Sequence, residues 1–151
     1  MNLSKHFTLA ELIRSEVAVR HGIDNRPTQN HIGNLRKLMN EILDPCRELI
    51  GKPISITSGY RNQQVNYIVG GAKTSQHTRG LAADFVVPGC QLWPIFTIIG
   101  RSTIPFDQLI YETSWLHIST AQSGTPRREV LVATRVNWKW TYTKTNLGAS
   151  E

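Results

Sequence analysis

The residues of this 151-residue chain that could carry chemistry are two histidines and an aspartate in contrasting surroundings. His77 lies on a glycine-containing loop, and Asp84 follows it within the apolar run at residues 81–87. Burying an isolated carboxylate costs several kcal/mol, and this run contains no lysine or arginine to compensate the charge. Because a bound metal ion would compensate it, the pattern predicts that Asp84 is a metal ligand.

A third candidate ligand, His117, lies in an alternating segment at residues 115–119. The two-residue period of a strand would place Leu116 and Ile118 on the core face and His117 on the face that can line a cleft. Two histidines and one carboxylate, with a fourth position left to water, are typical of a catalytic zinc site. A single histidine is more often a structural or surface residue, so the prediction of a zinc site depends on all three occurring together.

Arg61 is a candidate substrate ligand. It follows residues 57–60, where a predicted strand gives way to a turn. A guanidinium at such a place can hold a carboxylate or an oxyanion by two parallel hydrogen bonds. The alternative is an ordinary surface arginine, and the residue alone leaves both interpretations open.

The elements that must position these residues are predicted to be helices first and strands after them. Thr8 and Glu11 form a capping box at the start of a helix that fades near residue 21, and an apolar stripe predicts a long amphipathic helix at 28–50. Shorter helices are expected at 62–68 and 92–99, and strands at 54–58, 81–87, 108–111, 115–119 and 129–136. This order predicts an α+β fold with N-terminal helices packed on a small, mostly antiparallel sheet. We expect a single domain at 1–142 and a C-terminal tail at 143–151.

Composition narrows the classes of protein. Hydrophobic content of 40% and charged content of 19% are in the globular range, and no stretch approaches the ~20 apolar residues of a membrane span. We therefore expect a soluble protein, and a monomer. The net charge of +6 favours a polyanionic partner, but the basic residues are scattered, which argues against specific nucleic-acid binding. Cys46 and Cys90 lie far apart and are expected to be ordinary thiols of a reducing compartment.

Aromatic residues alternate with other residues near the end of the chain, at Trp138, Trp140 and Tyr142. We expect a strand that packs one face on the core. The alternative is an exposed stacking face for sugar rings or wall polymer.

Short motifs follow one another along the chain: Ser58-Gly59-Tyr60-Arg61, then Asn66 with Val69-Gly70-Gly71-Ala72, then Ser75-x-His77 with Gly80, Ala82 and Asp84-Phe85, and finally Trp115-x-His117-x-Ser119. In this order, over roughly residues 7–119, they resemble the zinc D-alanyl-D-alanine carboxypeptidase family of metallopeptidases. The resemblance implies the hedgehog/DD-peptidase fold and a Zn²⁺ ion held by His77, Asp84 and His117. It further implies that Arg61 steers or polarises the substrate and that Ser75 lies near the bound peptide.

The activity implied by the resemblance is hydrolysis of a peptide bond in peptidoglycan stem peptides. Family members cut either the terminal D-Ala-D-Ala bond or, in some phage lysins, the L-Ala-D-Glu bond, and the sequence leaves both open. Residues 1–7 have no apolar core behind them, so we expect no secretory signal. This suits a protein that stays in the cytoplasm of the producing cell, or a phage virion enzyme or lysin that reaches the wall after release.

The general base departs from the pattern of the family. Several relatives have an acidic residue three positions before the last zinc histidine, but Ser114 stands there and cannot act as a carboxylate base. Glu112 is the nearest acid and is predicted to take this role, with Asp107 as the second choice. Trp115 is expected to line the substrate cleft. Because of Ser114, a non-catalytic zinc-containing wall-binding module remains an alternative, and a basic nucleic-acid-binding domain is a third class.

Overall fold

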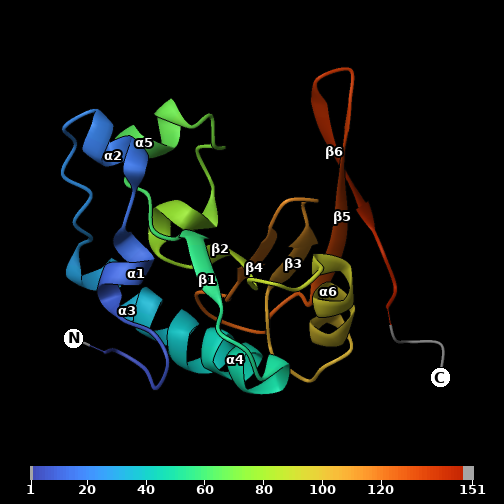
Figure 1. Cartoon of the computed structure of the whole chain (residues 1–151). Helices are drawn as coiled ribbons and strands as arrows, with labels where there is room; N and C mark the ends of the chain where they lie inside the picture. Colours follow the sequence, from blue (N-terminus) through green and yellow to red (C-terminus); the bar gives the residue numbers. More distant parts are fainter. Residues whose placement is uncertain (1, 148–151) are drawn as a thin grey trace.

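The first part of the chain is mainly helical, and a sheet follows it (Figure 1). The computed structural model describes residues 2–147. The α-helices are α1 (Leu9–Ile13), α2 (Glu16–Arg20), α3 (Gln29–Leu38), α4 (Asp44–Ile50), α5 (Gln63–Ile68) and α6 (Leu92–Gly100). A π-helical segment, η1 (Met39–Leu43), joins α3 to α4, and a 3₁₀ helix, η2 (Gln76–Arg79), precedes the second strand.

The N-terminal helix is divided into α1 and α2. Thr8 and Glu11 form the predicted capping box, each accepting a hydrogen bond from the other's backbone N–H. Arg14 then leaves the helical conformation, and Ser15 caps α2 by accepting from Ala18 N. The prediction of one helix up to residue 21 was wrong because Ser15 starts a new one.

The predicted long helix at 28–50 is confirmed as the continuous helical segment α3–η1–α4. Its wide π-helical turn lies just before Pro45, which has no N–H to donate to the carbonyl of Glu41 and whose ring would collide with it. The segment buries Leu35, Leu38 and Ile42 in the main core cluster. It therefore supplies most of the helical layer behind the sheet.

The sheet has six strands in the order β1-β2-β4-β3-β5-β6. They are β1 (Ser55–Ser58), β2 (Ala82–Val86), β3 (Gln108–Tyr111), β4 (Leu116–Ser119), β5 (Glu129–Val136) and β6 (Lys139–Lys144). Neighbouring strands are antiparallel except β3 and β5, which are parallel. The prediction of an α+β fold with a mostly antiparallel sheet is confirmed.

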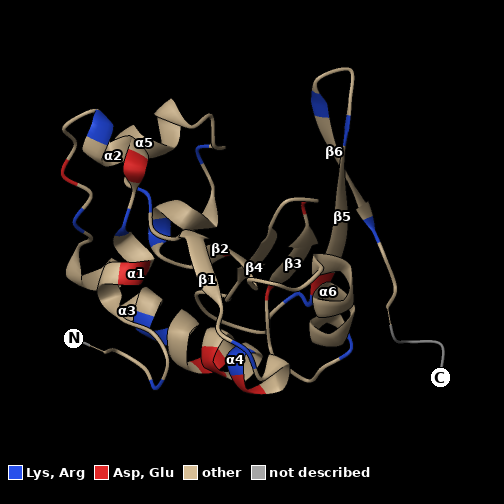
Figure 2. Ribbon diagram, in the orientation of Figure 1, with Lys and Arg blue, Asp and Glu red and all other residues tan. Residues whose placement is uncertain are grey.

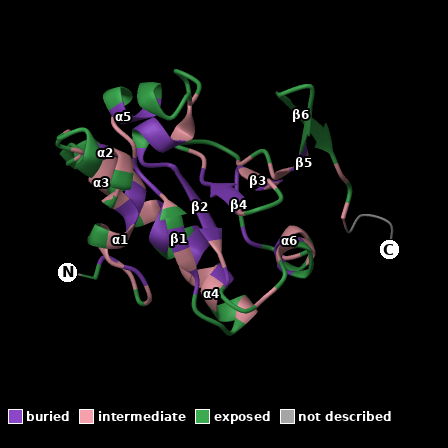
Figure 3. Cartoon of the chain, turned by 45° about the horizontal axis from the view of Figure 1, so that its top comes forward, coloured by how far each residue is buried: buried purple, intermediate pink, exposed green. Residues whose placement is uncertain are grey.

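The two faces of the sheet have different roles. One face contributes Ala83, Phe85, Leu109, Leu116 and Ile118 to the core cluster shared with the helices, and Figure 3 shows the buried strands β2 and β4 inside the molecule. The other face presents Asp84 and His117 and, further along, the small apolar cluster Ile110, Leu131 and Ala133. The alternation expected around His117 is therefore present. It places the side chains of Asp84 and His117 on the face of the sheet opposite the core.

β5 and β6 form a hairpin whose outer end projects from the body of the protein (Figure 1). Trp138, Trp140 and Tyr142 are 84%, 39% and 52% exposed, so the expectation that this stripe packs on the core was wrong. Nothing covers the outer part of the hairpin among the described residues, so alternation there does not mark a buried face.

The predicted tail at 143–151 is also corrected in part. β6 runs to Lys144, Thr145 N donates to Val130 O, and Leu147 packs against the core cluster. Residues 148–151 lie outside the described part of the chain. The single domain at 1–142 stays a prediction.

Lysine and arginine residues are spread over helices, connecting segments and the β5–β6 hairpin (Figure 2). Cys46 is buried and Cys90 half-buried, both as free thiols, and burial raises the pKa of the Cys46 thiol to about 12. None of the helices in residues 2–147 combines the length and apolar character needed to cross a membrane.

Candidate metal centre

Three side chains from separate elements meet beside the sheet. Asp84 in β2 and His117 in β4 are direct cross-strand neighbours, and His77 comes from η2. One possible ligand atom from each lies within 4.8 Å of the others. Asp84 Oδ1 is 3.1 Å from His117 Nδ1 and 3.3 Å from His77 Nε2. The structure thus brings together the three residues predicted as metal ligands.

The backbone around His77 fixes the orientation of its ring. Ser75 caps η2, with its Oγ accepting from His77 N at 3.2 Å. His77 Nδ1 lies 2.7 Å from the carbonyl oxygen of Gly59. Because a carbonyl only accepts hydrogen bonds, Nδ1 carries the proton and the lone pair of the neutral ring lies on Nε2. Nε2 is the atom that faces Asp84.

This set of atoms fits a zinc ion. Burial raises the pKa of the Asp84 carboxyl, but His77 and His117 together outweigh burial and hold it below its ordinary value, so the group is a carboxylate. A nitrogen lone pair facing a carboxylate at 3.3 Å needs a cation or a proton between them. Two imidazole nitrogens and a carboxylate oxygen are zinc ligands, and a carbonyl bound to the second ring nitrogen is the usual outer contact of a ligating histidine.

Gly59 has no room for a side chain. A Cβ there would lie 2.1 Å from the carbonyl oxygen of Leu12, and the same oxygen accepts from Tyr60 N at 2.7 Å. Any larger residue must therefore shift the backbone whose carbonyl orients His77.

We expect Gly59→Ala to weaken zinc affinity about 10- to 100-fold, the effect of losing an outer contact of a ligating histidine. Zinc titration against a competing chelator measures this, with thermal unfolding alongside. Gly33→Ala is the matched control, since a Cβ at Gly33 in α3 meets nothing within 4 Å. Equal zinc affinities for the two variants would contradict the proposed role of the Gly59 carbonyl.

His77, Asp84 and His117 line a pocket in the surface, and Glu112 lines it too. Glu112 lies in a tight turn after β3. Glu112 N donates to Trp115 O at 3.0 Å, and Thr113 has a φ of 69°. The indole Nε1 of Trp115 donates to Glu112 Oε2 at 3.2 Å, so Trp115 lines the pocket and also holds the carboxyl. Burial raises the pKa of Glu112, the charge of Asp84 raises it further, and the net shift is upward.

Arg61 lies in the wall of the pocket. Its Nη1 is 3.5 Å from Ser58 Oγ, and its buried Nε has no hydrogen-bond partner among the described residues. Burial lowers the pKa of the guanidinium, while the charges of Asp84 and Glu112 oppose that shift. The guanidinium of Arg61 thus lies in the pocket wall close to two carboxylates, and the fold leaves its buried Nε without a partner among the described residues.

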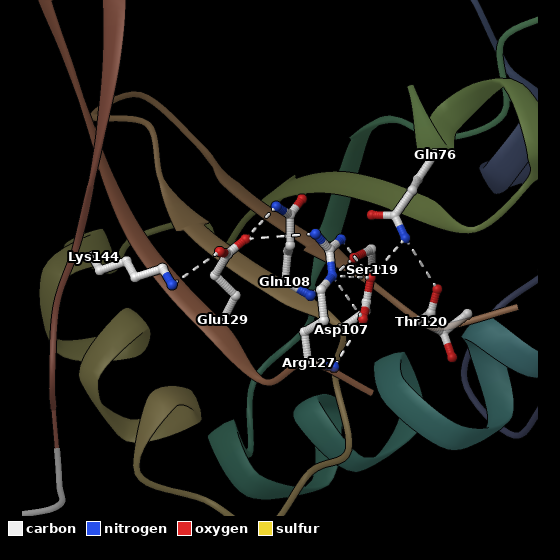
Figure 4. A network of polar contacts seen from close by, with 8 residues as sticks. All are labelled: Gln76, Asp107, Gln108, Ser119, Thr120, Arg127, Glu129 and Lys144. Atoms are coloured by element: carbon white, nitrogen blue, oxygen red, sulfur yellow. Dashed lines mark hydrogen bonds and ion pairs between the residues drawn. The ribbon is translucent and has the colours of Figure 1, made fainter. Parts of the chain in front are cut away.

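Asp107, the second candidate for the base, is engaged elsewhere (Figure 4). Its carboxylate accepts from Arg127 Nη2 at 2.7 Å, from Arg127 N at 2.9 Å and from Gln76 Nε2 at 3.0 Å. The hydrogen bonds from Arg127 are the main reason that the pKa of Asp107 is lowered. Gln76 also reaches Thr120 O at 3.4 Å. This network ties η2, and with it His77, to the end of β4.

The pocket has a volume of about 980 Å³ and is open to solvent. Residues 69–72 and 74–76 contribute to its lining, as do Trp140 and Tyr142 of β6. Asn66 anchors the loop that follows α5 by donating to Ala72 O at 2.9 Å. Gly71 leaves room for this contact, because a Cβ there would lie 2.1 Å from Asn66 Oδ1. A volume of this size has room for a ligand larger than a single metal ion.

Sequence reasoning missed several contributions to this site. The Gly59 carbonyl, the Gln76–Asp107–Arg127 network and the hydrogen bond from Trp115 to Glu112 were not predicted. Gly59 and Trp115 belong to the sequence motifs described above, but those motifs do not reveal which contacts the two residues make. Arg127 carried no signal, because its partner lies far away in the sequence.

Comparison with known proteins gives one family match. The family model described as Peptidase M15 matches residues 5–119, which is more than half of the chain. The matched segment contains His77, Asp84, His117, Glu112 and Arg61, and it ends before β5. No curated protein matches the chain.

Proposed function

Since the chain belongs to the peptidase M15 family, a family of metallopeptidases, we propose that it is a zinc enzyme that hydrolyses a peptide bond in peptidoglycan stem peptides. The observation that carries the proposal is the convergence of His77, Asp84 and His117 in the pocket that Glu112 and Arg61 also line. Each of these residues has a defined part in peptide hydrolysis.

His77, Asp84 and His117 would hold the zinc ion. When bound, zinc supplies a Lewis acid that polarises the scissile carbonyl and makes water acidic near neutral pH. The chain's own contribution to the proton transfer is Glu112, which takes a proton from the attacking water and passes it to the leaving amine. Trp115 donates to Oε2 of this carboxylate, and Oε1, which accepts no hydrogen bond among the described residues, would receive the proton.

Arg61 would bind the substrate. A stem peptide offers carboxylates, and the reaction develops negative charge on the carbonyl oxygen, and a guanidinium stabilises either. The place of Arg61 in the pocket wall, near Asp84 and Glu112, supports this role. The net charge of +6 also suits an acidic substrate.

Arg61→Gln should lower kcat/KM for stem-peptide hydrolysis about 100- to 1,000-fold, the usual loss on removing a donor to a developing oxyanion. Zinc content should not change, because Arg61 is not among the proposed ligands. Steady-state kinetics and metal analysis on the same preparation measure both quantities. Arg36→Gln, at an exposed position on α3, is the control. The role assigned to Arg61 is wrong if both variants hydrolyse the peptide at the parent rate.

Mass spectrometry of fragments released from defined peptidoglycan, with and without a chelator, tests the proposed function itself. We expect zinc-dependent release of peptide or D-alanine, and the fragment masses separate cleavage of D-Ala-D-Ala from cleavage of L-Ala-D-Glu. Protein with stoichiometric zinc that releases nothing from any purified peptidoglycan would refute the proposal.

A further inference from the structure

The outer part of the β5–β6 hairpin carries an exposed group of aromatic and basic side chains. We call Arg135, Trp138, Trp140 and Tyr142 the aromatic arm. The group lies outside residues 5–119, so membership of the family does not account for it. Trp138 and Trp140 contribute to no core cluster among the described residues. Large exposed aromatic groups of this kind mark interaction sites.

The aromatic arm continues the face of the sheet that carries the candidate metal centre. Asp84, His117, Ile110 and Leu131 lie opposite one another across β2, β4, β3 and β5.

On β6, Tyr142 pairs with Ala133 and Trp140 pairs with Arg135. Because side chains on a strand alternate and Ala133 is two residues from Leu131, both aromatic residues share the face of Asp84 and His117. Trp140 and Tyr142 also line the same pocket as the metal centre. A ligand in the pocket can therefore extend onto the arm without leaving this face.

The geometry of the aromatic arm suits stacking. The guanidinium carbon of Arg135 lies 5.1 Å from the centroid of the Trp138 ring and 5.8 Å from that of Trp140, within the range of a cation–π contact. Arg135 thus holds two indole rings in place. Residues two apart on a strand are spaced by about 7 Å, so Trp140 and Tyr142 make a platform longer than a single sugar ring.

From this arrangement we infer that the aromatic arm binds the sugar rings of the glycan strand to which a stem peptide is attached. A pyranose ring has flat faces of C–H groups that pack on the negative face of an aromatic ring, while its hydroxyl groups stay in water. The inference rests on the proposed function, because the pocket beside the arm is taken to hold the peptide. The enzyme would then prefer peptides that are still joined to glycan.

A second copy of the chain fits the aromatic arm less well than a glycan strand does. Residues 130–147 contain no acidic residue, and Figure 2 shows lysine and arginine but no acidic residue on the outer hairpin. β6 is the edge strand of the sheet, and pairing it with another β6 would bring Lys139 and Lys144 of two copies together. Single-stranded nucleic acid also binds aromatic and basic surfaces, but it has no chemical link to a peptide in the pocket.

Binding of peptide-free glycan strands to full-length protein carrying Glu112→Gln tests the inference without any need for hydrolysis. We expect saturable binding that Trp138→Ala and Trp140→Ala each weaken about tenfold, the loss of one stacking partner. Trp140→Phe, which keeps a ring, should retain most of the affinity. Tyr67→Ala is the control, since Tyr67 on α5 is 85% exposed and does not line the pocket.

The outcomes separate this inference from the proposed function. Absence of glycan binding, or parent-like binding by both alanine variants, overturns the role of the arm even if stem peptides are cleaved. Glycan binding that depends on the two tryptophans supports the arm even if no peptide is cleaved. Tryptophan-dependent binding of oligothymidine without glycan binding, or tryptophan-dependent dimerisation in sedimentation without glycan binding, would assign the surface to another partner and overturn the inference.

Discussion

Asp84→Asn should remove bound zinc and reduce stem-peptide hydrolysis about 1,000-fold or more. Asparagine keeps the size of the side chain but removes the negative charge that two imidazoles now face at 3.1 and 3.3 Å. Without that charge the site loses one of three ligands, and the several kcal/mol of transition-state stabilisation that zinc supplies are lost with it. Metal analysis after dialysis and initial rates on a defined stem peptide measure the two effects.

The control for Asp84→Asn is Asp24→Asn, at an exposed carboxylate whose partner is Arg26 on the surface. It should keep both zinc and activity. Unfolding of both proteins in chelator shows whether Asp84→Asn still folds, which we expect because asparagine matches aspartate in size. An Asp84→Asn protein that retains zinc and parent activity would show that this carboxylate is not a ligand.

Glu112→Gln should lower kcat about 100- to 10,000-fold and leave the zinc content unchanged. Glutamine cannot accept a proton, and loss of a general base has an effect of this size. Its amide can still accept the hydrogen bond that Trp115 Nε1 donates at 3.2 Å, so the local structure should persist. Pre-steady-state and steady-state rates on one substrate, with metal analysis, measure the change.

Glu41→Gln is the control, since Glu41 is an exposed acid in η1 on the helical segment. This comparison also decides between an enzyme and a wall-binding module that has lost turnover. In a module no rate exists for Glu112→Gln to change. A Glu112→Gln protein that hydrolyses peptide as fast as Glu41→Gln would assign the base to another group.

The convergence of His77, Asp84 and His117 could be predicted because each signal is local. A carboxylate in an apolar strand without a basic partner, and a histidine on the polar side of an alternating strand, are visible in a few residues. Asp84 and His117 are direct neighbours because of the register between β2 and β4, and no single segment of the sequence reveals that register.

Other features depend on contacts distant in sequence, which no local pattern reveals. Gly59 closely approaches the carbonyl oxygen of Leu12, and the Asp107 carboxylate is held by Arg127. Thr113 has a left-handed φ of 69° that usually belongs to glycine or asparagine, so the turn that brings in Glu112 had only a weak signal. The alternating aromatic pattern around Trp140 is the same in a strand packed on the core and in an exposed hairpin, so the sequence does not distinguish the two.

A crystal structure of the zinc-loaded protein, with anomalous data collected on both sides of the zinc edge, shows directly whether the three proposed ligands hold the metal. We expect one strong peak about 2 Å from a nitrogen of His77, an oxygen of Asp84 and a nitrogen of His117, with no fourth protein ligand. A peak at other residues, a fourth side chain closing the site, or no zinc between these three groups would contradict this expectation.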